Sequence, residues 1–399
     1  MKSALISGAG IAGPALAWWL HREGWRTTIV ERAPALRSGG YVIDFWGLGF
    51  DLAERMGLSR SIDQVGYHSS ELRVVGDRGQ RKAGFGVGVF DELTNGRFVT
   101  VARSDLARLI FEAGPSGATL FDDEIAAISQ DDEGVDVSFR KAPPRRFDLV
   151  VGADGLRSQV RRLVFGPDAQ FEKPLGYAFA AFEVTGYRPR DPDVYVMYGK
   201  PGRMLGRFSL HGDRCMFLCI FTHEGALPVG LAEQKTLVAS IFRDGAWETA
   251  AILKELEQTS ELYLDQVSQI VTPAWSKGRV ALVGDAAFCV SLLAGQGSAL
   301  AMVAAYVLAG ELASRGVGEG LAAYERLLRP YIELKQAGAS RFAGALAPRT
   351  RLGLWFRNRV LDALAIPGLS TLAVGREITD RLVLPDYPQL RTAAHAPAA

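Results

Sequence analysis

The apolar and polar positions of this chain show two different patterns, and residues 1–31 show the first of them. Residues 3–7 form a short apolar run with strand character, residues 14–24 place Ala17 and Leu20 on the inner side of a helix, and residues 26–30 read as a second strand. A strand, a helix and a second strand in this order are typical of a βαβ unit.

Later segments continue this mixture of helices and strands. We predict helices over residues 50–56, 104–113, 242–257 and 298–315, and strands over residues 71–75, 97–101, 147–151 and 279–283. Ser104 is expected to cap its helix, and residues 76–79 to form a hairpin turn. Residues 122–130 and 135–140 read as a hairpin, and residues 321–382 as helical with breaks at Pro348 and Pro367.

Between residues 177 and 222 the period of the apolar positions changes to two. Residues 178–184, 194–198, 204–210 and 215–222 read as strands without βαβ spacing. In the last of these strands both faces are apolar, so we expect protein or ligand to cover both. One cover could be the core and the other a ligand cavity.

Charge and cysteine content exclude several classes of protein. The 45 basic and 44 acidic residues leave a net charge of +1, which does not suggest a nucleic acid or charged membrane as partner. No run of about 20 uncharged apolar residues appears, and a chain that starts in a strand leaves no room for a signal peptide. Cys215, Cys219 and Cys289 form no Cys-x-x-Cys pair. We therefore expect a cytoplasmic protein without a disulfide framework or metal.

The turn between the first strand and its helix carries the chemistry that organises the chain. It reads Gly8-Ala9-Gly10-Ile11-Ala12-Gly13. Gly8 permits the tight turn, Gly10 lets a pyrophosphate approach the backbone, and Gly13 lets the helix pack closely on the strand. Glu31 ends the second strand, where a carboxylate can accept hydrogen bonds from ribose hydroxyls. We predict dinucleotide binding; the alternative is a glycine-rich turn without a ligand.

Two further strands end in glycine and an acid. One ends in Gly152-Ala153-Asp154-Gly155 and the other in Gly284-Asp285. Ligands of open α/β sheets lie beyond the carboxyl ends of the strands, so three such ends can converge on one ligand the size of FAD. Asp285 could accept from a ribityl or ribose hydroxyl. Gly295-Gln296-Gly297-Ser298 opens an apolar helix whose N–H groups could stabilise negative charge on a ring system.

As a set, these motifs resemble the single-component flavoprotein monooxygenases of the para-hydroxybenzoate hydroxylase type over about residues 3–330. The resemblance rests on the opening fingerprint with Glu31-Arg32, on residues 148–158, and on residues 284–287 with residues 294–297. By this resemblance Arg103 contacts the flavin. Residues 37–40 with Asp44, and residues 275–279, look most like the tetracycline-inactivating branch. That likeness implies that Arg37 contacts the nicotinamide cofactor and Asp44 lies near the flavin, and Gly40 indicates a close backbone approach to a ligand.

The chain departs from the family pattern at four positions. Phe288 stands where the family usually has histidine, Leu292 where it has a proline beside the flavin, and Ala299 where it often has asparagine. Trp46 stands where the tetracycline branch tends to carry a basic residue. FAD binding remains the expectation, whereas Trp46 argues against tetracycline itself as the substrate.

The resemblance implies an activity. NAD(P)H would reduce the FAD, O₂ would add to it, and a flavin hydroperoxide would deliver one oxygen atom to an aromatic or polyketide-like molecule. With no second fingerprint in the sequence, NADPH or NADH is expected to bind transiently. The chemistry needs neither a protein nucleophile nor a metal, so we assign no catalytic residue. The alternatives are another flavin oxidoreductase, such as a reductase, and a non-catalytic flavin-binding or substrate-sequestering protein.

We therefore predict an α/β fold, with a Rossmann-like FAD-binding domain, a second and mostly antiparallel sheet domain for the substrate, and C-terminal helices. The FAD-binding domain would comprise residues 1–70, 96–170 and 265–340, and the sheet domain residues 71–95 and 171–264. Helices within residues 341–389 would precede a tail of residues 390–399, with residues 349–383 either covering the substrate cavity or only docking on the core. We expect a monomer or a homodimer.

The sheet domain supplies the predicted substrate wall. Its members are Phe179, Arg207, His211, Phe217, Phe221 and His223, with Phe45 and Trp46 beside the flavin ring. Either histidine could orient a phenol or take its proton, although a hydrogen-bonded or exposed histidine at a strand end is the simpler reading. The other face of the last strand, with Met216, Leu218 and Ile220, could form the wall instead. Such a wall suits a flat, mostly apolar molecule.

Overall fold

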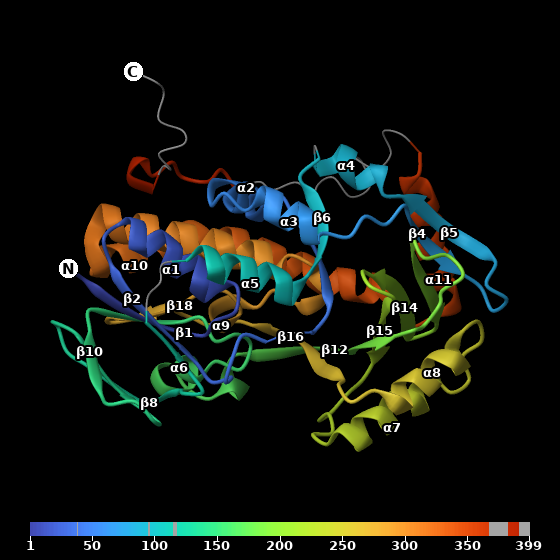
Figure 1. Ribbon diagram of the computed structural model, residues 1–399, viewed down its shortest axis with the longest axis horizontal. Coiled ribbons are helices and arrows are strands. Elements are labelled where there is room, and N and C mark those ends of the chain that lie inside the picture. The colour runs from blue at the N-terminus through green and yellow to red at the C-terminus, as the bar shows by residue number, and fades with distance from the viewer. Residues whose placement is uncertain (38, 95, 115–117, 367–381, 391–399) are drawn as a thin grey trace.

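The computed structural model describes residues 1–399 except 38, 95, 115–117, 367–381 and 391–399 (Figure 1). One part of the fold is built on a mostly parallel sheet. The strand order is β17-β18-β11-β1-β2-β7, and β17 alone runs antiparallel to its neighbour. The strands are β1 (Ser3–Ser7), β2 (Arg26–Glu31), β7 (Ala118–Phe121), β11 (Leu149–Gly152), β17 (Ser276–Lys277) and β18 (Val280–Leu282). The predicted α/β fold is therefore confirmed.

Helices from both ends of the chain cover this sheet on one side. The layer consists of α1 (Ala12–Arg22), α5 (Arg103–Ala113) and the long α10 (Gly297–Leu346), with α2 (Leu48–Arg55) and α3 (Ser59–Val65) packed outside it (Figure 1). α10 contains a break at Gly316, whose φ is 77°. By length and apolar composition α10 could cross a membrane, but 72% of its most apolar window is buried inside the fold, as in the core helix of a globular protein.

Two small sheets and several short helices accompany the parallel sheet. β8 (Ile125–Gln130), β9 (Val135–Phe139) and β10 (Arg145–Phe147) form one sheet, and β3 (Val42–Trp46) pairs with β6 (Phe98–Ala102). The short helices are α4 (Gly88–Thr94), α6 (Gln159–Val164), α9 (Asp285–Phe288), η1 (Asp168–Gln170), η2 (Leu292–Ala294) and η3 (Pro388–Leu390).

The other part of the fold is built on a mostly antiparallel sheet of seven strands. Their order is β16-β12-β15-β14-β13-β4-β5, with β13 and β4 parallel. The strands are β4 (Glu71–Val75), β5 (Arg81–Gly86), β12 (Glu172–Thr185), β13 (Val194–Lys200), β14 (Arg203–Leu210), β15 (Arg214–Thr222) and β16 (Tyr263–Ile270). Since β16 pairs along β12, this sheet continues past residue 264, where the sequence analysis placed a boundary.

Three helices flank this sheet. α7 (Leu231–Phe242) and α8 (Thr249–Gln258) cover the face turned away from α10, and α11 (Arg351–Leu364) packs on β5 and β13 (Figure 1). The large apolar side chains of Leu352, Trp355 and Phe356 on α11 are exposed. Arg357 of the same helix is buried and donates to the Leu346 carbonyl. Residues 367–381 of the predicted cover lie outside the described residues.

Several predicted element boundaries were wrong for local reasons. Ser104 does not cap its helix, because α5 already begins at Arg103 and Ala102 occupies the cap. The strand predicted over residues 147–151 is two strands, separated where Asp148 turns to accept hydrogen bonds from Ser3. The helix predicted over residues 242–257 is interrupted by a turn through Gly245 and Trp247, with α7 before it and α8 after it.

Candidate functional site

The three glycine-and-acid motifs lie at one edge of the parallel sheet. β18, β11, β1 and β2 are consecutive neighbours and run in the same direction. Gly284-Asp285, Gly152 to Gly155, the fingerprint and Glu31 therefore follow the carboxyl ends of four adjacent strands. This is the edge where open α/β sheets bind their ligands.

Close backbone contacts fix the three motifs against one another. Gly8 has a φ of 109°, and a Cβ there would lie 2.5 Å from the carbonyl oxygen of Ala153. Gly284 has a φ of 63°, and its Cβ would lie 3.3 Å from Cβ of Ala12 and 3.5 Å from Cβ of Ala301. A side chain at Gly8 would both strain the backbone and push the first two motifs apart.

The fingerprint leaves room for a phosphate group. A Cβ built on Gly10 meets its nearest atom, Nη2 of Arg103, only at 3.9 Å, whereas one on Gly13 would run into the Gly8 carbonyl. α1 begins at Ala12, so its first N–H groups and positive dipole end lie at the same turn. The open space at Gly10, the helix start and the nearby guanidinium fit the pyrophosphate of FAD.

Glu31 is held at this turn by backbone donors. Its carboxylate accepts from the amides of Ala9 and Ala33, both at 2.9 Å. Glu31, the residue predicted to bind the ribose, thus lies beside the fingerprint. Arg32, the next residue, is exposed.

Asp285 and Arg103 carry opposite charges that interact, and Tyr41 lies beside Arg103. A Cβ on Gly297 would lie 3.7 Å from Oδ1 of Asp285, which places this carboxylate beside the first residue of α10. Desolvation raises the pKa of Asp285, and the charge of Arg103 opposes that rise. Desolvation likewise raises the pKa of Tyr41 to about 12. Gly297, within the segment expected to face the ring system, therefore lies close to the acid of the third motif.

Asp44 is held by the strand that pairs with its own. Its Oδ1 accepts from Thr100 Oγ1 at 2.7 Å across the β3–β6 pair. The residue is exposed, and desolvation raises the pKa of its carboxyl group. Arg37 and Gly40, on the loop before β3, are also exposed, and Ser38 between them lies outside the described residues.

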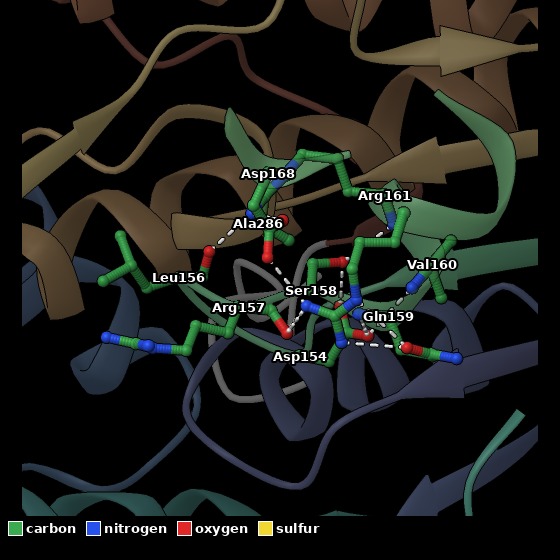
Figure 2. Close-up of polar contacts among 10 residues, drawn as sticks. Asp154, Leu156, Arg157, Ser158, Gln159, Val160, Arg161, Asp168 and Ala286 are labelled. Atoms are coloured by element: carbon green, nitrogen blue, oxygen red, sulfur yellow. Dashed lines mark hydrogen bonds and ion pairs between the residues drawn. The ribbon is translucent and has the colours of Figure 1, made fainter. Parts of the chain in front are cut away.

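Asp154, predicted to bind the cofactor, accepts hydrogen bonds from two neighbouring elements of the protein. Its two carboxylate oxygens accept from Ser158 Oγ and the amides of Gln159 and Val160 (Figure 2). One of them also accepts from Ser7 Oγ. These donors belong to the end of β1 and the start of α6. Asp154 therefore joins the first two motifs.

A buried arginine that the sequence analysis missed joins the second motif to the third. Arg161 of α6 is 0% exposed and donates to the carbonyls of Ala286 and Leu156 and to Asp168 (Figure 2). Ala286 directly follows Asp285 in α9, so this contact fixes the short helix that carries the acid. The signal was the spacing of Ser158 and Arg161 at the start of a helix, where Ser158 caps the amide of Arg161.

One face of the seven-stranded sheet is turned toward these motifs. Phe179 packs there with Tyr41 and Tyr263, at ring-centroid distances of 5.4 and 6.0 Å. Met216, Leu218 and Ile220 share this face, against which Leu292 and Leu293 pack. Phe179 therefore lies on the face that is turned toward the motifs. In β15, the alternative wall of Met216, Leu218 and Ile220 lies on that same face.

The remaining predicted wall residues need correction. Phe217 and Phe221 lie on the opposite face, fully buried beneath α7 and α8. Arg207 points the same way and is bound to Glu248 at 2.6 Å. The parity of β15 explains the error, since both faces of this strand are apolar and buried, and α7 and α8 cover the one that carries Phe217 and Phe221.

The two predicted histidines lie at ends of strands. His211 is exposed, and its Nε2 lies 3.1 Å from the Gly66 carbonyl. His223, at the end of β15, packs its ring near Phe221 of the helix-covered face. The simpler reading of both residues, as histidines at strand ends, agrees with these contacts.

Phe288 and Ala299, two of the departures from the family pattern, have packing explanations. Phe288 is buried and stacks on Trp275 at 4.5 Å, and Trp275 in turn packs on Tyr324. Ala299 lies against α2, since a Cβ on Gly49 would be 2.5 Å from Cα of Ala299. Small size at residue 299 thus permits the close contact between α2 and α10.

Comparison with known proteins agrees with this site. A family model described as FAD binding domain matches residues 1–339. A flavin-dependent monooxygenase from an unknown prokaryotic organism is 33% identical over 348 residues, which cover 84% of this chain and 88% of that protein. The FAD-dependent monooxygenase asL6 of Sarocladium schorii is 30% identical over 416 residues, covering 97% of this chain and 98% of that protein.

Among solved structures, the tetracycline destructase Tet(51) matches with a TM-score of 0.80 and 30% identity, over 97% of this chain and 100% of that one. The predicted likeness to the tetracycline-inactivating branch is therefore confirmed at the level of similarity. From the family match, the relatives and the three joined motifs, we conclude that the chain belongs to the FAD-binding-domain family of flavin-dependent monooxygenases.

Proposed function

We propose that this monooxygenase hydroxylates a flat, multi-ring phenolic or polyketide-like molecule, with NADH or NADPH as the reductant. The observation that carries the proposal is the aromatic and apolar face of β12 and β15, where Phe179, Tyr41 and Tyr263 stand beside the FAD motifs. Rings pack edge-to-face on such surfaces, and an apolar wall with a few polar groups is the usual lining of a small-molecule site.

FAD, when bound, supplies the redox chemistry: electrons from the nicotinamide reduce O₂, one oxygen atom enters the substrate and the other leaves as water. The chain's own residues bind, orient and exclude water. In this proposal Glu31 and Asp285 accept from hydroxyls of the cofactor, and Arg103 neutralises its phosphates. Arg37 and Gly40, exposed on the loop before β3, would meet the transient nicotinamide cofactor.

The fixed arginine of the substrate sheet argues against a small aromatic acid. Arg207 is 1% exposed and held by Glu248 from the far side of the sheet. It is therefore not free to clamp a carboxylate in front of the flavin. The same position of Arg207 favours a larger and mostly neutral substrate, which would be recognised by its apolar contact surface and not by a single ion pair.

The test is substrate-stimulated oxidation of NADPH and NADH by the FAD-loaded protein, with mass spectrometry of the product. The panel should contain flat phenolic polyketides, tetracyclines and simple hydroxybenzoates. A product heavier by one oxygen atom that takes its label from ¹⁸O₂ would support the proposal. Oxidation of NAD(P)H with no oxygenated product from any multi-ring phenol would contradict it.

We further propose that the protein works in the cytoplasm as a monomer or homodimer. The near balance of 45 basic and 44 acidic residues supports this proposal, because it gives no electrostatic reason to bind a nucleic acid or an anionic surface. Light scattering of the FAD-loaded protein would measure the oligomeric state directly.

A further inference from the structure

The chain that follows Asp285 is held through its backbone carbonyls. Residues 286–290 lead from this acid toward the short helix η2 and the start of α10. Arg161 donates to the first of these carbonyls at 2.9 Å, and Thr272 Oγ1 donates to the second, that of Ala287, at 2.7 Å. Both donors belong to buried residues. The start of this segment is therefore fixed by side chains from outside it.

Two buried glutamines hold the end of the same segment. Gln269 of β16 donates through Nε2 to the Val290 carbonyl at 2.9 Å. Gln336 of α10 donates through Nε2 to the Cys289 carbonyl at 3.2 Å. Gln269 is 2% exposed and Gln336 is 8% exposed. Each carbonyl would lose this donor if its glutamine were replaced by an apolar residue, and an unsatisfied buried carbonyl is costly.

The two glutamines also join the elements that carry them. Nε2 of Gln269 donates to the backbone carbonyl of Gln336 at 2.7 Å, and Nε2 of Gln336 donates to that of Ile270 at 2.8 Å. A side-chain amide can donate two hydrogen bonds, and each glutamine donates both to backbone carbonyls. A strand of the substrate sheet, the long helix α10 and residues 289–290 are thus joined at one buried point.

The segment held in this way leads directly to the groups expected at the flavin. Ser291 Oγ accepts from the amide of Leu293 at 3.2 Å and so caps η2. Residues 295–298 follow at once, and their N–H groups are expected to face the ring system. Reduction adds electrons to that ring, so donors aimed at it bind the reduced form more tightly than the oxidised form. Such donors are effective only while the backbone that carries them is held in place.

We propose that Gln269 and Gln336 are positioning residues, which hold the backbone of residues 289–298 so that it stabilises reduced FAD. They act through the carbonyls of Cys289 and Val290 and do not have to touch the cofactor. The inference rests on the FAD site and not on the identity of the substrate, and it can be measured without turnover.

Gln269→Met and Gln336→Met each remove both amide donors and keep most of the side-chain length. We expect oxidised FAD to stay bound in both variants and reduced FAD to bind about tenfold less tightly, which is the lower end for one hydrogen bond to a charged group. For a two-electron couple, a tenfold change lowers the midpoint potential of bound FAD by about 30 mV. Anaerobic titration against redox dyes of known potential measures this shift.

Tyr306→Phe is the control. Tyr306 also lies in α10, is 2% exposed and donates to a backbone carbonyl, that of Pro385, at 3.0 Å. The variant therefore takes a donor away from a carbonyl in the C-terminal residues and keeps the aromatic ring. Its stability in urea should fall, whereas its midpoint potential should equal that of the wild type.

Wild-type potentials in both glutamine variants, with lowered stability in urea, would show that these residues only hold the fold. The same shift in Tyr306→Phe, or loss of oxidised FAD from the folded glutamine variants, would overturn a role specific to the reduced cofactor. If Gln336→Met does not fold, Gln269→Met decides alone. The proposed hydroxylation fails separately, through the absence of an oxygenated product from the wild-type protein.

Discussion

Replacing Arg161 with methionine should lower the free energy of unfolding more than a comparable change nearby, because Arg161 joins the second motif to the third. Arg161 is 0% exposed and donates at 2.9 Å to the Ala286 carbonyl, at 2.6 Å to the Leu156 carbonyl and at 2.6 Å to Asp168 (Figure 2). Arg161→Met preserves much of the apolar stem, so its cost comes from the groups that lose their donor.

The magnitude follows from those groups. Each buried carbonyl left without its donor costs about 1–3 kcal/mol, and Asp168 keeps one partner in Arg162 at 2.8 Å. The total is about 3–5 kcal/mol of unfolding free energy, which is the usual range for breaking a buried ion pair from one side. Arg161 Nε has no hydrogen-bond partner among the described residues, so its removal offsets part of this cost.

Arg162→Met is the matched control, because the two arginines are adjacent and share Asp168. The Arg162 side chain is 36% exposed and its ion pair is screened by solvent, so its loss should cost at most about 1 kcal/mol. Urea unfolding followed by tryptophan fluorescence measures both. If the two variants unfold at the same urea concentration, the buried contacts of Arg161 do not hold the motifs together.

Three further predictions concern the cofactor, the substrate face and pH. Asp285→Ala should weaken FAD binding by about 1.5–3 kcal/mol through loss of a charged hydrogen bond; wild-type affinity in a flavin fluorescence titration would show that this strand end is misplaced. Leu218→Ala should raise KM with unchanged FAD content, whereas Phe217→Ala, beneath α7 and α8, should leave KM unchanged; both side chains are buried, so the two variants should also lose about 2–5 and 3–5 kcal/mol of stability. The reverse pattern in KM would invert the assignment of faces. Desolvation raises the pKa of Asp44 above about 3.8, so the FAD-free folded protein holds this proton more tightly than the unfolded chain and loses stability as pH rises through the window between the two pKa values. Asp44→Asn should flatten that loss, and superimposable pH–stability curves of the variant and wild type would contradict the reasoning.

Local sequence sufficed for the FAD-binding half of the protein. The turn at Gly8 and the approach at Gly10 depend on the backbone of a few consecutive residues, and the carboxyl ends of parallel strands reach the same sheet edge whatever the rest of the chain does. The fingerprint, Glu31 and Gly284-Asp285 could therefore be located from the printed residues alone. The alternation over β12 to β15 likewise predicted strands, because side chains on a strand alternate between faces.

Tertiary structure alone decided which groups face the ligand and which serve the protein. Cys215, Phe217, Cys219 and Phe221 are no more apolar than Met216, Leu218 and Ile220, and both faces of β15 are buried, so only the tertiary structure shows which face α7 and α8 cover. The hydrogen bonds from Ser7 and Ser158 to Asp154 are likewise seen only in the fold. Arg161 acts through the Ala286 carbonyl, a contact over 125 residues. Such pairings depend on long-range packing, which periodicity and motif spacing do not encode.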